Sequence, residues 1–297
     1  FQYRKIVFLT GAGISAESGL SLFRGKNGLW NNRNPEEVAT AEALLQRRSD
    51  VLDFYNGLRH DMAEAKPNAA HLAISRLQQG YSGEVYILTQ NMDTLHEKAG
   101  SENVYHIHGQ INKIRCSHCH NVWETWNDIT PDMPCPFCRA EKSLRPDIVF
   151  FGEEIMFTSV AEDLLRCADL FVAVGTSGEI PPASRFVWEA WKNGAKTLAF
   201  NLEPPANSVC FDRLVLGKAD ETLPEFIKNQ FMTVQLPFIY RNYKFRHTGS
   251  AMRLNLFLLV ADDNGILTAV FSFRRIGRHI QRCTDIHILP LCLQRKR

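Results

Sequence analysis

The chain has 297 residues, of which 45% are hydrophobic and 22% are charged, and its formal net charge is +2. These values are typical of a globular protein and exclude a disordered or low-complexity chain. The apolar stretch Leu254–Val260 ends at Asp262, well short of a membrane-spanning length, so no membrane partner is expected.

Short apolar runs alternate with helical patterns through most of the chain. The runs lie at Lys5–Thr10, Val85–Thr89, Leu170–Val174 and Thr197–Phe200, and the helical patterns around Glu42–Met62, Asn68–Gln79 and Ser184–Asn193. Strands that alternate with helices favour a parallel sheet with right-handed crossovers. The sequence therefore predicts an α/β fold with a Rossmann-like parallel sheet.

A glycine-rich loop follows the first apolar run. Gly11, Gly13 and Ala16 satisfy the pattern GxGxx(G/A), which lets the backbone approach a pyrophosphate at a helix N-terminus. A structural turn would need one glycine rather than two, so nucleotide binding is favoured. The acidic residue expected about 20 positions later would be Glu36 or Glu37, but neither follows a convincing second strand, and here the pattern departs from a dehydrogenase.

Other polar groups follow the remaining strands. Gln90–Asp93 follows the second run, Gly175–Ser177 the third and Asn201–Glu203 the fourth. Ligands of open α/β sheets bind at the carboxyl ends of the strands. His108 follows a short alternating segment, and an imidazole that titrates near neutrality can act as a general base. Each motif alone could be an ordinary turn or a packed histidine, whereas together they favour a ligand site.

Four of the eight cysteines form two CxxC pairs, Cys116 with Cys119 and Cys135 with Cys138. The spacing matches a zinc ribbon in which four thiolates hold one structural ion. His118 and His120 could replace a cysteine as ligands, although surface positions are more typical. Metal-bound thiols favour a reducing compartment, and we expect a cytoplasmic protein.

The last part of the chain is basic. Residues 231–297 contain 11 Lys and Arg against 3 Asp and Glu, and Leu254–Ala261 and Ile266–Phe273 flank a turn at Asp262–Gly265 that predicts a β-hairpin. No nucleic-acid-reading motif accompanies the charge, so a nucleic acid partner is not expected. We divide the chain into a catalytic unit, residues 1–230, with a helical insertion at about 33–75 and a zinc module at about 109–147, and an extension, residues 231–297.

The motifs together resemble the sirtuin family. They are GAGISAESGL and FRG within Gly11–Gly25, TQNMD at Thr89–Asp93, HIHG at His106–Gly109, the two CxxC pairs, VFFGE at Val149–Glu153, GTS at Gly175–Ser177 and NLE at Asn201–Glu203. All occur in the family's order across residues 5–230. The resemblance implies an NAD-dependent protein lysine deacylase that releases nicotinamide and O-acyl-ADP-ribose, with His108 as the catalytic base.

The resemblance also implies the cofactor and metal residues. NAD would be held by Gly11, Ala12, Gly13, Ile14, Ser15, Ala16, Phe23, Arg24, Trp30, Gln90, Asn91, Met92, Asp93, Gly175, Thr176, Ser177, Asn201, Leu202, Glu203 and Ala219, and one zinc ion by the four cysteines. Two alternatives are an NAD-dependent oxidoreductase with a structural zinc and a non-catalytic NAD or ADP-ribose sensor. Release of nicotinamide would distinguish the deacylase from both.

The implied substrate is an acylated lysine in an extended peptide. Val149, Phe150, Phe151 and Gly152, with Ser177–Ile180 opposite, would clamp the peptide as added β-strands. Ala43 and Tyr55 resemble the class III branch, which removes acidic acyl groups. That branch has the pattern YxxR, but Leu58 stands at the arginine position here and Arg59 follows it. Succinyl or malonyl removal is therefore expected only if Arg59 reaches the pocket.

Overall fold

The computed structural model describes residues 3–22, 28, 34–232, 242–247, 250–261, 267–275 and 287–291. The chain divides into two compact units, Phe1–Met232 and Thr233–Arg297. The predicted cofactor residues Phe23, Arg24 and Trp30, and the predicted turn at Asp262–Gly265, lie outside the described residues. No helix within the described ranges has both the length and the apolar character needed to cross a membrane.

A six-stranded parallel sheet forms the centre of the first unit. Its strands are β1 (Lys5–Thr10), β2 (Glu84–Thr89), β3 (Val104–His106), β7 (Leu170–Val174), β8 (Lys196–Asn201) and β9 (Arg213–Leu216), in the order β3-β2-β1-β7-β8-β9. The four predicted runs are thus confirmed as strands. The order reverses between β1 and β7, which is the point where a doubly wound sheet binds ligands.

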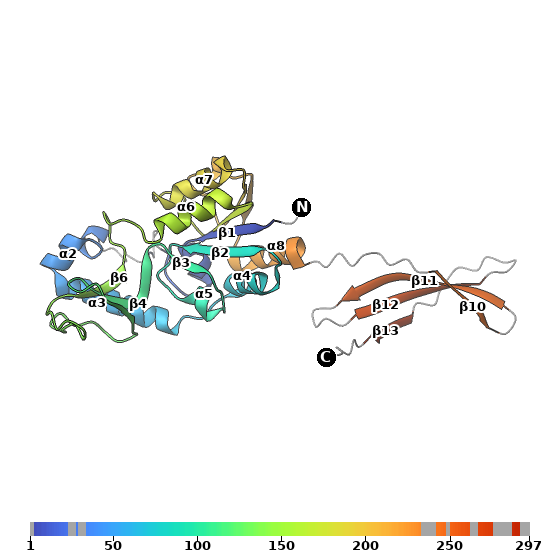
Figure 1. Cartoon of the computed structure of the whole chain (residues 1–297), viewed down its shortest axis with the longest axis horizontal. Coiled ribbons are helices and arrows are strands. Elements are labelled where there is room, and N and C mark those ends of the chain that lie inside the picture. Colours follow the sequence, from blue (N-terminus) through green and yellow to red (C-terminus); the bar gives the residue numbers. More distant parts are fainter. Residues whose placement is uncertain are drawn as a thin grey trace. The chain divides into compact units, whose positions relative to one another are not determined.

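Helices cover both faces of this sheet (Figure 1). α4 (Ala69–Gly80) and α8 (Ala219–Ile227) pack on the face that carries Ile6 and Phe8, whereas α6 (Thr158–Cys167) and α7 (Phe186–Lys192) pack on the face of Val7 and Leu9. Successive residues of a strand point to opposite faces, so a continuous apolar run such as β1 requires both layers. The Rossmann-like fold is therefore confirmed.

A smaller module lies at the edge of the first unit and is called the small module below. It comprises α2 (Ala41–Gln46), α3 (Arg48–Glu64) and an antiparallel sheet of β4 (Gly109–Cys116), β5 (Val122–Glu124) and β6 (Leu144–Ile148) in the order β5-β4-β6. The predicted helix over Glu42–Met62 is two helices, because the backbone of Arg47 leaves the helical region with φ −133° and ψ 49°. The module has its own hydrophobic cluster.

Several short elements complete the first unit. They are α1 (Ala12–Ser15) and α5 (Leu95–Lys98), 3-10 turns at Ala16–Ser18, Pro35–Glu37, Ala183–Arg185 and Ser208–Cys210, and a π turn at Lys228–Met232. Asn68 caps α4 by accepting a hydrogen bond from the backbone of Ala70, and its Nδ2 donates to the carbonyl of Ile14 (2.7 Å). The start of α4 is thereby attached to the loop that follows β1.

The second unit contains a four-stranded antiparallel sheet. Its strands are β10 (Asn242–His247), β11 (Ser250–Ala261), β12 (Leu267–Arg275) and β13 (His287–Leu291), in that order. β11 and β12 pair antiparallel over the two predicted apolar segments, with a bulge between Leu256 and Leu258. The predicted hairpin is therefore confirmed, whereas β10 and β13 were not predicted.

Candidate active site and metal centre

The loops after β1, β2, β7 and β8 open into one cavity of about 1120 Å³. The predicted residues that line it are Gly11, Ala12, Gly13, Ser15, Gln90, Asn91, Met92, Asp93, His108, Gly175, Thr176, Ser177, Asn201, Leu202 and Glu203 from the sheet, and Tyr55, Val149, Phe150, Phe151 and Gly152 from the small module and the segment that follows β6. The cavity thus lies at the point where the strand order reverses. It is large enough for a nucleotide and part of a second ligand.

The main chain forms the wall of the cavity beside the glycine loop. The backbone N–H of Gly13 donates to the carbonyl of Gly175 (2.8 Å), and a Cβ on Gly13 would lie 2.6 Å from the Cα of Gly175. Asn201 holds the neighbouring loop, accepting from Thr176 N (3.1 Å) and donating to Thr176 O (2.6 Å). The space beside Gly13 is thus filled by the main chain of Gly175, so the two loops pack backbone against backbone. Both loops line the cavity and present backbone groups there, which fits a pyrophosphate.

A buried polar group lies at the centre of the cavity. The hydroxyl of Ser15 donates to Asp93 Oδ2 (2.9 Å), and Asn91 Nδ2 donates to Ser15 Oγ and to the carbonyl of Gly11, both at 3.1 Å. Burial raises the pKa of Asp93, while hydrogen bonds from the Leu95 backbone and the Ser15 side chain oppose the rise. The group can offer hydrogen bonds to a sugar and an amide.

His108 has one ring nitrogen fixed by the backbone. Nδ1 lies 3.1 Å from the carbonyl oxygen of Gln90, and Nδ1 of His106 lies 2.9 Å from that of Asn91. A carbonyl can only accept, so Nδ1 of neutral His108 carries the proton and Nε2 keeps its lone pair. Burial lowers the pKa of His108, although the bond to Gln90 opposes this. Neutral His108 can therefore accept a proton at Nε2.

The part of the cavity nearest the small module is apolar and is called the acyl channel below. Its walls are Ala39, Tyr55, Met62, Ile148 and Phe150. The rings of Tyr55 and Phe150 stack with centroids 5.7 Å apart and an interplanar angle of 27°. Among the described residues that line the whole cavity there is no lysine or arginine, so in this part of the chain nothing offers a cation to an acidic group.

The four predicted cysteines form the metal centre. Their Sγ atoms all lie within 4.8 Å of one another, and the Cys116–Cys138 and Cys119–Cys135 pairs are each separated by 3.7 Å. Four sulfurs about 2.3 Å from a tetrahedral zinc ion would be about 3.8 Å apart. The residues therefore fit zinc with no open coordination position. His118 and His120 are both exposed and lie outside the cluster.

The thiols also need a cation for electrostatic reasons. Hydrogen bonds from Asn121 lower the pKa of Cys119. The Ala140 backbone favours the thiolate of Cys138, yet burial and the sulfurs of the three other cysteines raise its pKa to about 12. Four thiolates packed at this distance repel one another, and a divalent ion removes that repulsion.

Arg59 does not lie on the cavity. Its side chain is fully buried, with Nε donating to the carbonyl of Ile111 (3.1 Å) and Nη1 to Asn56 Oδ1 (2.6 Å). Tyr55 lies one turn away on the same helix face and does line the cavity. Arg59, proposed as a substrate residue, therefore does not meet the condition set for succinyl or malonyl removal, because contacts with β4 hold its guanidinium away from the acyl pocket.

Several other predicted residues, Gly178 among them, are not among the described residues that line the cavity. Ile14 and Ala219 belong to the hydrophobic cluster under the sheet, Ala43 belongs to that of the small module, and Ala16 starts the turn after α1. The lining residues that sequence motifs did not indicate include Ala39, Met62, Ile148 and Thr158. They reach the cavity through tertiary packing, for which the sequence carries no local signal.

Comparisons with known proteins agree with this geometry. The Sir2 family model matches residues 11–182. An NAD-dependent protein deacylase of Caulobacter vibrioides is 45% identical over 227 residues, which is 75% of this chain and 95% of that protein. A solved Sir2 homologue in complex with NAD has a TM-score of 0.71 and 35% identity, over 76% of this chain and 89% of its own. A Sir2 protein bound to a deacetylated peptide and an acetyl-ADP-ribose has a TM-score of 0.67 and 27% identity, over 77% and 94%.

Proposed function

We infer that the chain, which belongs to the Sir2 (sirtuin) family, is an NAD-dependent protein lysine deacylase. One observation carries the inference: a single cavity joins the glycine loop, the Ser15–Asn91–Asp93 group and a histidine with a free Nε2 lone pair. When bound, NAD supplies the ribose carbon from which nicotinamide departs and the ADP-ribose that takes the acyl group. One water is consumed when the acyl group leaves the lysine nitrogen, and the products are nicotinamide, free lysine and O-acyl-ADP-ribose.

The residues around the cavity have different roles according to their position. The backbone around Gly13 and Gly175 holds the phosphates, and Asn201 and Glu203 hold the adenosine half. Asn91 and Asp93, with Gln90, orient the nicotinamide ribose and its carboxamide, supported by the hydrogen bonds among Ser15, Asn91 and Asp93. Nε2 of His108 accepts a proton from a ribose hydroxyl, because Nδ1 is already committed to Gln90.

We propose that the substrates are acylated lysines in extended peptides held by Val149–Gly152 and Ser177–Ile180. The preferred acyl groups are acetyl and longer apolar chains, because the described lining of the acyl channel carries no cation and Arg59 is bonded elsewhere. Leu58 packs against the hydrophobic cluster of the small module, so it offers an acidic acyl group no hydrogen bond. Four reduced metal-binding cysteines favour the cytoplasm.

The test of the function is incubation with NAD and an acetyl-lysine peptide, followed by mass spectrometry. A deacylase releases nicotinamide, deacylated peptide and O-acyl-ADP-ribose in equal amounts. An oxidoreductase would change the redox state of NAD without releasing nicotinamide, and a sensor would bind NAD and leave the peptide acylated. Either result would contradict the proposal.

The acyl preference is tested by kcat/KM for acetyl, butyryl and succinyl forms of one peptide. We expect kcat/KM for the acetyl and butyryl peptides to exceed that for the succinyl peptide in the wild type. Leu58 packs against the cluster that contains Tyr55 and Phe150, so Leu58→Arg should raise kcat/KM for the succinyl peptide, because a guanidinium can donate two hydrogen bonds to a carboxylate. Arg59→Leu should not lower the succinyl value relative to acetyl. A wild type that strongly prefers succinyl would show that this account of the acyl channel is wrong.

A further inference from the structure

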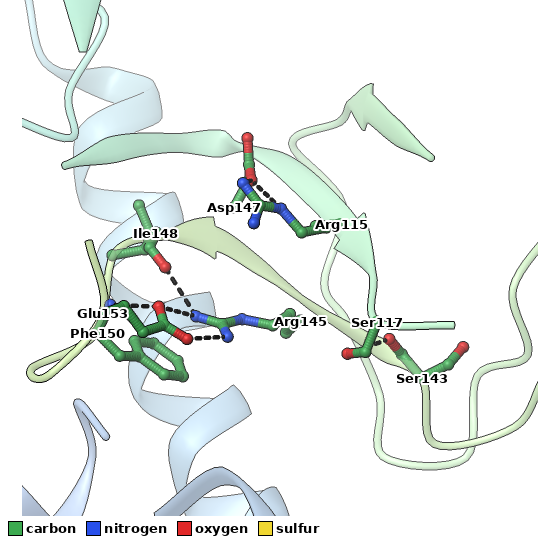
Figure 2. Close-up of polar contacts among 8 residues, drawn as sticks. All are labelled: Arg115, Ser117, Ser143, Arg145, Asp147, Ile148, Phe150 and Glu153. Atoms are coloured by element: carbon green, nitrogen blue, oxygen red, sulfur yellow. Dashed lines mark hydrogen bonds and ion pairs between the residues drawn. The ribbon is translucent and has the colours of Figure 1, made fainter. Parts of the chain in front are cut away.

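An ion pair between Arg145 and Glu153 flanks Val149–Gly152, the segment proposed to bind the peptide (Figure 2). Arg145 lies on β6, its side chain is 12% exposed, and its Nη1 and Nη2 donate to the two carboxylate oxygens of Glu153 at 2.6 and 3.0 Å. Nη2 also donates to the carbonyl of Ile148 (2.8 Å), and Glu153 Oε2 accepts from the backbone N–H of Phe150 (2.8 Å). The pair therefore holds both ends of the turn that begins where β6 ends.

The same guanidinium supports the aromatic wall of the acyl channel. Its Cζ lies 3.9 Å from the ring centroid of Phe150, and this ring stacks on Tyr55. Phe150 and Tyr55 are 1% and 2% exposed, and both line the cavity. A planar guanidinium over an aromatic face fixes the plane of that ring. One side chain thus sets the backbone of the segment and the orientation of the channel wall.

Other backbone hydrogen bonds also hold the segment, and one of them, from Glu153 N to the carbonyl of Phe150 (3.0 Å), spans the same turn. Val149 N donates to the carbonyl of His108 and Phe151 N to that of Ala39, both at 2.9 Å. The backbone N–H of Phe150 points away from these partners and is held by Glu153. A peptide that adds as a strand needs the edge to be fixed beforehand, because otherwise ordering the edge reduces the affinity.

We propose, on the basis of the function inferred above, that Arg145 and Glu153 are positioning residues that pre-form the peptide-binding edge. Opposing burial, the hydrogen bonds and charge of Arg145 and the bond from the Phe150 backbone lower the pKa of Glu153, so the carboxylate stays ionised. Neither residue donates to or accepts from a reacting atom in this account. The pair sets the KM for the peptide, while kcat and the KM for NAD depend on the other side of the cavity.

A second ion pair on the same sheet offers a matched control (Figure 2). Arg115 Nε donates to Asp147 Oδ1 at 2.7 Å, and the two residues lie on the paired strands β4 and β6. Neither is among the described residues that line the cavity. Loss of this pair removes similar chemistry from the same module without releasing the peptide-binding edge.

The experiment compares Arg145→Met, Glu153→Gln and Arg115→Met with the wild type, using one acetyl-lysine peptide and NAD. For Arg145→Met we expect the peptide KM to rise by about tenfold to a hundredfold, the equivalent of ordering one or two residues on binding. The value of kcat and the KM for NAD should change less than about threefold. Glu153→Gln keeps an acceptor for the Phe150 N–H but loses the charge, so its peptide KM should rise by a smaller factor.

The possible results distinguish a failure of the positioning role of Arg145 and Glu153 from a failure of the proposed deacylase function. A wild type that releases no nicotinamide contradicts the proposed function itself. An active wild type with an unchanged peptide KM in Arg145→Met, or an equal rise in Arg115→Met, overturns the positioning role alone. If Arg145→Met does not fold, as judged by thermal melting, Glu153→Gln decides by the same readout. A fall in kcat with unchanged peptide KM in that variant would also overturn the proposal.

Discussion

Gly175 is the position where one added methyl group tests the architecture of the cofactor site. Its φ is +63°, and a Cβ there would lie 2.3 Å from Ile14 N and 2.4 Å from the carbonyl carbon of Gly13. Contacts shorter than 3.0 Å are essentially never seen, so the loops after β1 and β7 would have to separate by about 0.7 Å. That movement strains the hydrogen bond from Gly13 N to Gly175 O.

The cost of Gly175→Ala follows from two terms. A left-handed backbone costs an alanine about 1–2 kcal/mol, and overpacking adds about 1–3 kcal/mol. At about 2–4 °C per kcal/mol for a unit of this size, the melting temperature should fall by roughly 4–20 °C. If even 1.4 kcal/mol of the strain is felt at the glycine loop, the Kd for NAD rises about tenfold.

The assays are differential scanning calorimetry and calorimetric titration with NAD. Gly57→Ala is the control, because Gly57 lies inside α3 with nothing within 4 Å of its added Cβ, and alanine there should be neutral or stabilising by up to about 1 kcal/mol. A Gly175→Ala protein that melts and binds NAD like the control would refute the claim that main-chain contact between the two loops shapes the site.

Three further predictions concern the metal, the base and two buried histidines. Purified protein should contain one zinc ion per chain, and Cys135→Ser should unfold the small module because metal binding and folding are coupled; zinc-free protein, or a variant with an intact fold by circular dichroism, would contradict this. His108→Tyr should lower turnover by about 10²–10⁴-fold while NAD still binds. Because the pKa of His108 is lowered, the acidic limb of kcat/KM should have its midpoint below pH 6.5, and a midpoint above that value would exclude His108 as the base. Burial lowers the pKa of His71 to about 4 and that of His96 well below 6.5. The unfolded chain therefore binds more protons between pH 4 and 6.5, and the free energy of unfolding should fall by roughly 1.4 kcal/mol per pH unit for each histidine as the pH drops through that window; His71→Gln should reduce the slope in urea titrations, and an equal slope would refute the assignment.

The central sheet could be predicted closely because its strands are buried on both faces. A strand such as Lys5–Thr10 must then be apolar throughout, and the run itself gives the boundaries. Two helices, α6 and α8, could not be predicted from comparable sequence patterns. α8 contains Pro224 inside the helix. The N-cap residue of α6 is Phe157, which has a left-handed backbone and a side chain that cannot cap the helix.

The candidate site likewise has a part that the sequence could predict and a part that it could not. Strand-end loops such as Gly175–Ser177 could be predicted to meet, because parallel strands bring their carboxyl ends to one edge. The acyl channel could not, since Met62 and Ala39 reach it only through the packing of the small module. For Arg59 the helical period gave the correct face, but a hydrogen bond to the carbonyl of Ile111 decides where the guanidinium lies.

The separate hydrophobic cluster of the small module has a consequence for how such an enzyme can diverge. Tyr55 and Phe150, which wall the acyl channel, pack in this cluster, whereas the glycine loop rests on the clusters of the parallel sheet. Mutations in one cluster that lie more than about 7–10 Å from the other, with no shared partners, usually act independently of it. A related protein can therefore change its acyl specificity through substitutions in α3 and β6 while its affinity for the dinucleotide is retained.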